Sequence, residues 1–567
     1  MQNISGIWDC LVSPVKPTLL ENEFLSLFTK NHLSIMAVGN FSNIYKIRDE
    51  LHKLSYTFNS GDTSEILLTA YKHFGTDFIH KLEGSFSIAL WDFARQQLYL
   101  FRDRLGLSSF FYLIKGQRIS FATKIDVLLE KHKKEAILDA DGLREILGIG
   151  PAKTAGTAPF KNIREIKPAC YGVFDKTGFK EIEYWRTIPR EHKDCEESTA
   201  STIKTLLTDS VIKHLQAKNP CTMLSGGLDS TIITAIASKH FKEQYGKKLD
   251  TFSFDYMDND KHFSSSSFQP DIDRPWIERA VSALDTNHSY IECSSEDLIN
   301  NLFTAVDAKG LPGMGDIDAA MLIFCNEIRQ THDCALSGEG ADEIFGGYPW
   351  FHRDLTPGVF PWSQCTTVRQ TFVKDDLLHS LNLKKYVYDR YQEAVSKAKK
   401  SSFNDCKHQE LGTLTLDWFG ATLTNRLGKM SSFAKLNTVM PFLEHKLVEY
   451  LHNVPFPMKT KGDIVKYLLR KAFEADLPHE LLYRKKSPFP KTYNPNYERK
   501  LREMMQEVLA DSSQPIHQII CKNKVRAALN ASKLSTVPWF GQLMAGPQQL
   551  AYFLQINYWL KKYNILV

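Results

Sequence analysis

The chain has 567 residues, which is too many for one ordinary hydrophobic core, so its length predicts two or three domains. Hydrophobic residues make up 43% of the sequence and charged residues 24%, proportions that are typical of folded globular proteins and that exclude a disordered or fibrous chain. The 70 basic and 65 acidic residues leave a net charge of only +5, spread along the chain, so we expect no nucleic-acid partner.

Targeting signals and cysteine pairs are missing from the sequence pattern. The opening segment MQNISGIWDCLVSPV has no charged part followed by a long apolar run, and no stretch reaches the ~20 apolar residues of a membrane helix. Ten cysteines occur singly between Cys10 and Cys521, without a CxxC pair or a close Cys/His cluster. We therefore expect a cytoplasmic protein with reduced cysteines and no membrane partner.

Residues 1 to 188 carry short runs of β-branched and aromatic residues, among them SFSIALWDF, QQLYLFRD and SSFFYLIKGQRISFAT, separated by turn signals. This pattern predicts a β-rich, layered first domain. The polar stretch from Arg186 to Thr199 contains Pro189 and several charges, so we expect it to be a linker.

The hydrophobic period becomes helical from Thr199 onward. One face of the predicted helix carries the apolar residues Ile203, Leu206, Leu207 and Val211. A short apolar strand, CTML, follows, and further strands such as TFSFDY and CALS alternate with helical segments. That alternation predicts a parallel α/β sheet in a second domain of residues 199 to 567, whose last helix, PQQLAYFLQINYWLKKY, is expected to dock on the core.

The segment LSGGLDS, Leu224 to Ser230, joins strand CTML to a predicted helix. Gly226 and Gly227 allow a tight turn with N–H groups pointing inward, and the helix N-terminus adds positive potential, so this turn can bind phosphate. Ser225 and Ser230 could donate hydroxyls to that phosphate, and Asp229 could reach a magnesium ion. A turn that only connects strand to helix is the alternative. The lysine of a Walker A loop is missing.

A second glycine-rich segment, SGEGADEIFGGYPWF from Ser337 to Phe351, follows the apolar strand CAL. It brings Glu339, Asp342 and Glu343 to the edge of the same sheet, where α/β folds bind ligands. Crowded carboxylates need a cation, so Asp342 suits a second magnesium ligand, and Glu339 could accept a proton from an attacking amine. The alternative is a solvated acidic loop.

Together the two motifs resemble the C-terminal domain of class B asparagine synthetases. The resemblance continues through NRLGKMSS, MPFLEHKLVEY, VKYLLRKAF and RKKSPFPKTYNP, and covers nearly all of residues 199 to 567. It implies an ATP-pyrophosphatase-type α/β synthetase domain that uses ATP and Mg²⁺ to adenylate a carboxylate, and then forms an amide with an amine or ammonia.

The same resemblance implies roles for individual residues. Asp229 and Asp342 match magnesium ligands. Nucleotide and pyrophosphate contacts are implied for Ser225, Gly226, Gly227, Ser230, Ser337 and Gly338, and an adenine site for Leu224 and Phe254. Lys466 matches a lysine that stabilises pyrophosphate, because a fixed cation in a dry site stabilises the charge that builds on the leaving group. Without the resemblance, Lys466 would be interpreted as a surface lysine.

The N-terminal part also resembles the family, whose members begin with a glutaminase of the N-terminal-nucleophile hydrolase type. The segments from Gly84 to Tyr112 and SEILLTAYKHFG follow the family pattern, so we expect the fold to be kept. The chemistry is expected to be lost: Gln2 stands where the family has its nucleophilic cysteine, and Cys10 has no α-amine of its own.

Other departures agree with a degenerate glutaminase domain. An RGPD segment is missing, and the residues that replace family motifs are Val38, Gly39 and Asn40 for the NGE turn and Thr63 for the substrate-binding aspartate. The sequence therefore predicts that this chain does not hydrolyse glutamine.

The nitrogen donor must then be free ammonia, ammonia from a separate glutaminase, or an amine within the substrate. The family resemblance extends to β-lactam synthetases and lasso-peptide cyclases, although the former tend to have tyrosine where this chain has Glu339. Gly428 and Val439 replace a family acid and a family arginine, which argues against aspartate as the acid.

The leading hypothesis is amide formation on a peptide or specialised metabolite, including lasso-type macrolactam closure. The alternatives are asparagine synthesis from aspartate and ammonia, an amidotransferase fed by a separate glutaminase, and a catalytically silent binding subunit. A homodimer or a partner protein that delivers substrate is compatible with each of them.

Overall fold

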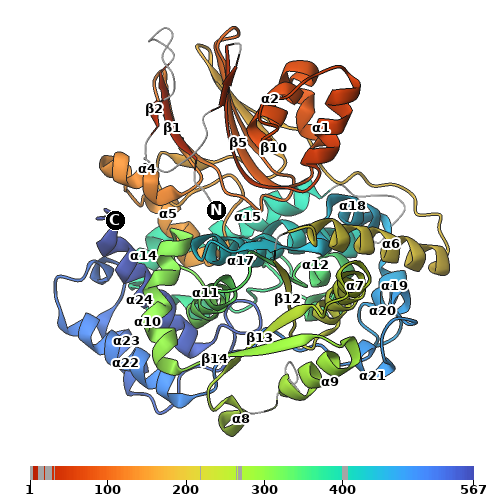
Figure 1. The fold of residues 1–567 in the computed structure, drawn as a ribbon. Helices are drawn as coiled ribbons and strands as arrows, with labels where there is room; N and C mark the ends of the chain where they lie inside the picture. The colour runs from red at the N-terminus through yellow and green to blue at the C-terminus, as the bar shows by residue number, and fades with distance from the viewer. Residues whose placement is uncertain are drawn as a thin grey trace. The chain divides into compact units, whose positions relative to one another are not determined.

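The computed structural model describes residues 4–9, 18–19, 28–30, 32–217, 219–263, 265, 271–398 and 406–567 (Figure 1). It divides into two compact units. The smaller unit comprises Met1–Gly142, Lys153–Thr187 and Tyr563–Val567, and the larger unit comprises Leu143–Ala152 and Ile188–Lys562. The domain limits at residues 188 and 199 remain a prediction. Gln2 and Cys10 lie outside the described residues.

Two antiparallel sheets form the smaller unit, in the order β11-β10-β6-β5-β4-β3 and β2-β1-β8-β7-β9. The strands are β1 (Ser5–Asp9), β2 (Thr18–Leu19), β3 (Phe28–Lys30), β4 (Leu33–Phe41), β5 (Gly84–Asp92), β6 (Gln97–Arg102), β7 (Phe111–Lys115), β8 (Arg118–Ala122), β9 (Ile163–Glu165), β10 (Cys170–Asp175) and β11 (Gly178–Glu183). The prediction of a layered β-rich domain of the N-terminal-nucleophile hydrolase type is confirmed.

Alternation along β5 explains the layers. Phe86, Ile88 and Leu90 point to one side, where they belong to a core with residues of α1 (Ile44–Lys53) and α2 (Thr63–Phe74). Ala89 and Trp91 point to the other side, into a core that includes residues of the second sheet. Because side chains of a strand alternate between its two faces, one strand serves both cores.

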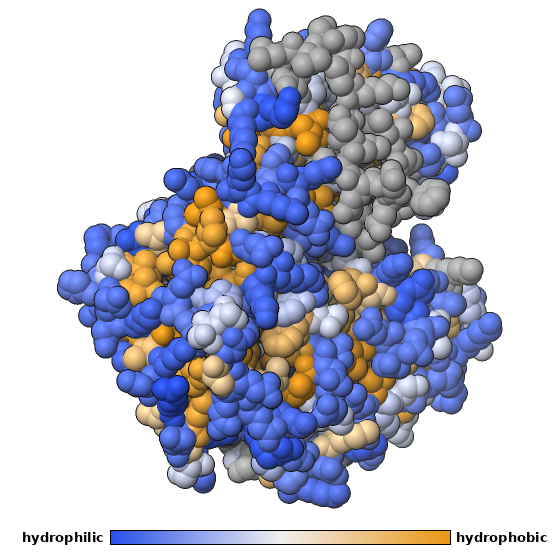
Figure 2. All heavy atoms as spheres, turned by 90° about the vertical axis from the view of Figure 1, so that its left-hand side faces the viewer, coloured by the Kyte–Doolittle hydropathy of each residue, from blue (hydrophilic) through white to orange (hydrophobic). Residues whose placement is uncertain are grey.

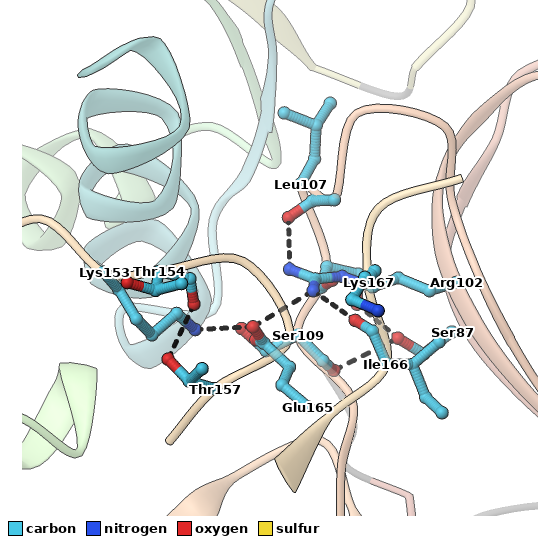
Figure 3. Close-up of polar contacts among 12 residues, drawn as sticks. Ser87, Arg102, Leu107, Ser109, Lys153, Thr154, Thr157, Glu165, Ile166 and Lys167 are labelled. Carbon is cyan, nitrogen blue, oxygen red and sulfur yellow. Dashed lines mark hydrogen bonds and ion pairs between the residues drawn. The ribbon is translucent and has the colours of Figure 1, made fainter. Parts of the chain in front are cut away.

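A buried ion cluster joins separate segments of the smaller unit (Figure 3). Arg102 and Lys153 converge on the carboxylate of Glu165, at N···O distances of 3.1 and 2.6 Å. Arg102 also donates to the carbonyl oxygens of Ile166 and Gly106, at 2.5 and 2.8 Å. The arginine of the family-like segment from Gly84 to Tyr112 therefore holds loops of the smaller unit together.

A five-stranded parallel sheet lies at the centre of the larger unit, in the order β14-β13-β12-β15-β16. Its strands are β12 (Pro220–Met223), β13 (Asp250–Tyr256), β14 (Asn287–Cys293), β15 (Cys334–Leu336) and β16 (Asn437–Val439). From β12 the chain builds outward to β14, then returns to build outward on the other side from β15. The strand order therefore reverses between β12 and β15, and open α/β sheets bind ligands at such a point. The prediction of a parallel α/β sheet is confirmed.

Helices make up most of the remaining larger unit. They include α6 (Glu196–His214), α7 (Leu228–Tyr245), α9 (Arg274–Leu284), α10 (Ser295–Lys309), α11 (Asp316–Arg329), α12 (Ala341–Phe345), α14 (Asp375–Leu381), α15 (Leu383–Lys397), α16 (Cys406–Leu414), α17 (Ala421–Phe433), α18 (His445–Asn453), α20 (Tyr467–Ala472), α22 (Pro495–Ala510), α23 (Lys522–Asn530) and α24 (Gly546–Lys562). Helix α24 is buried along most of its length, so its predicted docking on the core is confirmed.

One boundary differs from the sequence prediction. Helix α6 begins at Glu196, within the segment expected to be a linker. Acidic residues are favourable in the first turn of a helix, and Glu196 is also paired with Lys471 at 2.5 Å. The charges that suggested a linker therefore belong to a helix start.

Within the described residues there is no membrane-spanning helix and no disulfide. Among the described helices, none combines the length and apolarity needed to cross a bilayer. Figure 2 shows hydrophilic residues over most of the displayed face of the larger unit, with smaller hydrophobic areas between them. The cysteine side chains that the structure describes are free thiols.

Candidate active site

The first glycine-rich loop follows β12 and leads into α7. Gly226 has φ +67°, and a Cβ atom there would lie 2.8 Å from the backbone nitrogen of Ile277, so the turn requires glycine. The hydroxyls of Ser225 and Ser230 lie 2.9 Å apart, and Ser230 also accepts a hydrogen bond from the Ser225 N–H at 3.1 Å. Gly227 is the N-cap of α7. The loop is compact and ends at a helix N-terminus.

The second loop follows β15 and lies directly against the first. A Cβ atom on Gly338 would be 2.8 Å from the backbone nitrogen of Ser230 and 3.0 Å from the carbonyl carbon of Asp229. The N–H of Ser337 donates to the carbonyl of Val439 at 2.9 Å, which fixes this loop to β16. The two turns, separated by more than a hundred residues in the sequence, therefore meet backbone to backbone.

Both loops line one cavity of about 240 Å³ in the larger unit. The predicted residues on its wall are Leu224, Ser225, Gly227, Asp229, Ser230, Phe254, Ser337, Gly338, Glu339, Asp342 and Lys466. Gly226 is the predicted residue outside this wall, and its role is the tight turn described above. The residues selected from sequence thus lie together, whereas their chemical roles remain predictions.

An apolar region forms one end of the cavity, where the sequence predicted an adenine site. Phe254, in β13, lies near Phe324 and Phe489, with ring centroids 5.6 and 6.4 Å apart, and the second pair is stacked at 19°. Leu224 is buried, and its N–H donates to the carbonyl of Phe252 at 2.8 Å. Such a surface suits the face of a purine ring.

Four charged side chains form a cluster at the loop junction. The Lys466 ammonium lies 2.5 Å from Oδ2 of Asp229 and 2.6 Å from Oδ1 of Asp342, and Lys486 pairs with the other oxygen of Asp342. Burial alone would raise the pKa of Asp342, but the two lysines outweigh it and hold that pKa well below its ordinary value. Burial raises the pKa of Asp229 against the pull of Lys466.

Lys466 is held in an unusual backbone conformation. It has φ +57° and ψ +38°, a left-handed conformation that costs a non-glycine residue of order 1 kcal/mol, and its side chain is only 5% exposed. Lys466 immediately precedes α20 and is the N-cap residue of that helix. The conformation directs a long cationic side chain into the cavity between two carboxylates.

Glu339 lies on another part of the wall, paired with an arginine. Arg426, from α17, donates from Nη2 to Oε1 of Glu339 at 2.8 Å and lies over the ring of Phe489 at 5.2 Å. Nearby Glu343 accepts a hydrogen bond from the hydroxyl of Tyr348 at 2.8 Å. Burial and the neighbouring Asp342 and Glu339 carboxylates raise the pKa of Glu343 to about 8.

Sequence reasoning missed several cavity residues. Arg426 lies in the family-like segment NRLGKMSS, and Arg484 and Lys486 lie in RKKSPFPKTYNP, but no role was predicted for any of the three. The Nη1 of Arg484 donates to the carbonyl of Ser225 at 3.2 Å. The repeated basic residues of RKKSPFPK were the available signal for Lys486 and Arg484. Nothing local marks Arg426, because an arginine within a helix is usually a surface residue.

Gly428 and Val439, the two departures from the family pattern that were expected near the substrate, lie away from the cavity wall. Neither Gly428 nor Val439 is among the described residues that line the cavity. Val439 acts through its carbonyl, which anchors Ser337, and the carbonyl of Gly428 accepts from Ser431 Oγ at 3.2 Å. In this chain neither position contributes a side chain to the cavity wall.

The donor set fits a divalent cation. Asp229 Oδ1 is buried and has no hydrogen-bond partner among the described residues, and Asp229 and Asp342 are close enough to share the Lys466 ammonium. Two carboxylates at the edge of a phosphate-sized turn are hard oxygen ligands of the kind magnesium prefers.

The smaller unit contains a buried aliphatic side chain where the family has the first residue of its NGE turn. Val38 is 8% exposed and belongs to the core between the two sheets. Gly39 has φ +127°, and a Cβ there would lie 2.1 Å from the carbonyl oxygen of Ser85. Thr63 is the first residue of α2. The strand is preserved by packing, while its position 38 offers no polar side chain.

Comparison with known proteins agrees with these motifs. Residues 202–561 match the family model described as asparagine synthase, and residues 27–185 match the glutamine amidotransferase domain. Asparagine synthetase (glutamine-hydrolyzing) 3 of Bacillus subtilis is 40% identical over 537 residues, which covers 94% of this chain and 88% of that protein.

More distant relatives cover most of the chain as well. Asparagine synthetase (glutamine-hydrolyzing) 1 of Bacillus subtilis is 24% identical over 514 residues, covering 84% of this chain and 78% of its own. Amidase chyE of Penicillium rubens is 24% identical over 524 residues, which covers 80% of this chain and 76% of that protein.

Proposed function

This chain belongs to the asparagine synthase family and is an ATP-dependent ligase of the asparagine-synthetase type, and we propose that its larger unit adenylates a carboxylate and transfers the acyl group to ammonia or an amine. The observation that carries the proposal is the backbone contact between the loops of Gly338 and Asp229, beside Lys466. In this arrangement a triphosphate bound by one loop is within reach of the charged groups of the other.

The first step forms an acyl-adenylate. A carboxylate oxygen of the substrate attacks the α-phosphorus of ATP, the bond to the bridging oxygen breaks, and pyrophosphate leaves with the electron pair. Lys466 and Lys486 neutralise the charge that builds on that leaving group, an effect that is strongest for a cation withdrawn from water, as Lys466 is. Ser225 and Ser230 supply hydroxyl donors to the phosphates.

The second step forms the amide. The nitrogen attacks the acyl carbon, AMP leaves, and one proton must be removed from the nitrogen. Glu339 is the residue that we assign to accept it, with Arg426 holding its carboxylate in place. Asp229 and Asp342 would hold magnesium, which when bound supplies shielding of the phosphate charge.

We further propose that the chain does not supply its own ammonia. Val38, an aliphatic core residue, cannot donate a hydrogen bond to an oxyanion, and Thr63 carries no charge with which to hold the ammonium group of glutamine. Ammonia would then come from solution or from a separate glutaminase, or the substrate would carry its own amine.

Two classes of acid fit the proposal. A carboxylate on a peptide or specialised metabolite, macrolactam closure included, agrees with a smaller unit that lacks glutaminase residues. Aspartate is the second candidate, favoured by the names of the two Bacillus subtilis relatives. The cavity residues identified above do not discriminate between them.

The test is pyrophosphate and AMP release from ATP with aspartate and with a panel of peptides, using ammonium or glutamine as the nitrogen source. Turnover that glutamine does not support as a nitrogen source, lost in Asp229→Ala and unchanged in Cys10→Ala, is the expected result; ammonium is needed unless the substrate carries its own amine. Glutamate production from glutamine would contradict the second proposal, and no turnover with any acid would favour a silent binding subunit. A peptide product lighter by one water would identify ring closure.

A further inference from the structure

The four charged side chains at the loop junction, Asp229, Asp342, Lys466 and Lys486, are paired with one another. Asp229 and Asp342, the residues assigned to a divalent cation, are each already paired with a lysine. Lys466 bridges the two carboxylates, and Lys486 takes the remaining oxygen of Asp342. The two carboxylates and two ammonium groups thus balance within this four-residue cluster without any ion from solution.

Asp229 keeps Oδ1 without a hydrogen-bond partner among the described residues, but both oxygens of Asp342 are paired, so a divalent cation that binds both carboxylates must compete with the ammonium groups at Asp342. Lys466 lies between Asp229 Oδ2 and Asp342 Oδ1, at 2.5 and 2.6 Å, so its ammonium group already neutralises the two carboxylates that would attract a divalent cation. The displaced ammonium would remain in a largely buried site, where an unpaired charge is unfavourable. Binding of a metal alone is consequently opposed by the protein's own cations.

A triphosphate removes that opposition. Its oxygens are anionic acceptors for ammonium groups, so each lysine can exchange a carboxylate for a phosphate without losing its ion pair. We propose that Lys466 and Lys486 compete with the divalent cation for Asp229 and Asp342, and that triphosphate binding relieves this competition. Metal and nucleotide then bind tightly only together, an inference that rests on the proposed assignment of both to this cavity.

The two lysines contribute differently. The Lys466 side chain is 5% exposed and contacts both aspartates. Its backbone is held in a left-handed conformation, so we expect its response to a ligand to be a movement of the side chain. Lys486 is 25% exposed and, of the two aspartates, forms an ion pair with Asp342. Removal of Lys466 should therefore affect metal binding more than removal of Lys486.

The experiment measures Mn²⁺ binding to the full-length protein by electron paramagnetic resonance, with and without a non-hydrolysable ATP analogue. In the wild-type protein the analogue should strengthen Mn²⁺ binding by at least about tenfold. Lys466→Met should strengthen binding in the absence of the analogue by about tenfold, and Lys486→Met by less. Lys485→Met is the matched control, because Lys485 lines the same cavity without a hydrogen bond or ion pair to either aspartate in the described structure.

The inference would be overturned if, without the ATP analogue, both Lys466→Met and Lys486→Met bound Mn²⁺ as tightly as the wild-type protein or more weakly. Circular dichroism of each variant establishes that it is folded, and Asp229→Asn should abolish Mn²⁺ binding, which assigns the signal to this site. The readout is independent of turnover. A protein that couples Mn²⁺ and nucleotide as described, yet releases no pyrophosphate with any acid, would refute the proposed function and leave this inference standing.

Discussion

Arg426 and Glu339 are 87 positions apart in the sequence, and the guanidinium of one donates to the carboxylate of the other at 2.8 Å. Arg426 is 2% exposed, so its charge is withdrawn from water and is balanced by Glu339 on the cavity wall. This charge-assisted hydrogen bond joins Nη2 of Arg426 to Oε1 of Glu339, and such a bond restrains a carboxylate more strongly than a bond from a neutral donor does. The pair therefore fixes where the assigned base points.

This relationship predicts that Arg426→Met affects the second half-reaction selectively. Amide formation should fall by about 100-fold, the lower range for loss of a positioned base, because the Glu339 carboxylate is no longer restrained. Exchange of labelled pyrophosphate into ATP should remain within about threefold of wild type, since that step does not use Glu339. Rescue by Arg426→Lys should be partial. Equal losses in both assays would show that Arg426 supports the cavity as a whole.

The contact between the two loops predicts a strong effect of Gly338→Ala. The added Cβ would meet backbone atoms of Ser230 and Asp229 at 2.8 and 3.0 Å, and backbone cannot move aside as a side chain can. The loops must separate, so we expect the Kd for ATP, measured by calorimetry, to rise by about tenfold or more. Gly412→Ala is the control, because its Cβ would enter open space. Similar behaviour of the two variants would refute the argument.

Lys466→Met should impair pyrophosphate departure. One preorganised electrostatic contact to a developing anion contributes about 10²- to 10³-fold in rate, and Lys466 is buried beside both aspartates. We expect a fall of that size in kcat for pyrophosphate release. The KM for the acid should change little if the lysine acts in the transition state, and a rise in KM at constant kcat would indicate a role in ground-state binding.

The smaller unit offers a prediction about pH and stability. Burial by itself would raise the pKa of Glu65, but hydrogen bonds from the backbone N–H groups of Asn59, Ser60 and Gly61, with Lys30, lower it to about 2. Because the folded pKa lies below the unfolded value, the stabilisation is present above about pH 4.5 and is lost as pH falls toward 2. Glu65→Gln should lower the free energy of unfolding at pH 7 by about 2 kcal/mol.

Urea unfolding of the wild-type protein and of Glu65→Gln, at pH 7 and at successively lower pH values, measures the contribution of the Glu65 carboxylate to stability. The difference between wild type and Glu65→Gln should shrink as the carboxylate of the wild type becomes protonated. A constant difference from pH 7 to pH 3 would mean that the charge of Glu65 contributes nothing.

Local patterns in the sequence were sufficient for the glycine-rich turns and the parallel sheet. The loops of Leu224 to Ser230 and Ser337 to Asp342 each combine a short apolar strand, glycines and acidic or hydroxyl residues within a few positions, so their conformation and strand ends could be read directly. Their mutual contact followed from the general tendency of α/β sheets to bind ligands at strand ends.

Contacts between distant segments could not be read in this way. Lys486 reaches Asp342 across 144 positions, and Arg426 reaches Glu339 from a helix whose local pattern gives no sign of a buried charge. Val38 shows the converse, since its replacement of a polar family residue was visible in the sequence, but its place in the core between two sheets required the fold. The start of α6 was misplaced because Glu196 and its neighbours resembled a polar linker.

The central claim is that a carboxylate takes AMP from ATP at the two glycine-rich loops. The most direct test supplies the acid with ¹⁸O in its carboxylate, aspartate first and then the peptide panel, together with ammonium, and determines the products by mass spectrometry. The account predicts one ¹⁸O atom in AMP, unlabelled pyrophosphate, and loss of both products in Asp229→Ala. Formation of ADP and phosphate, or amide formation with unlabelled AMP, would contradict it.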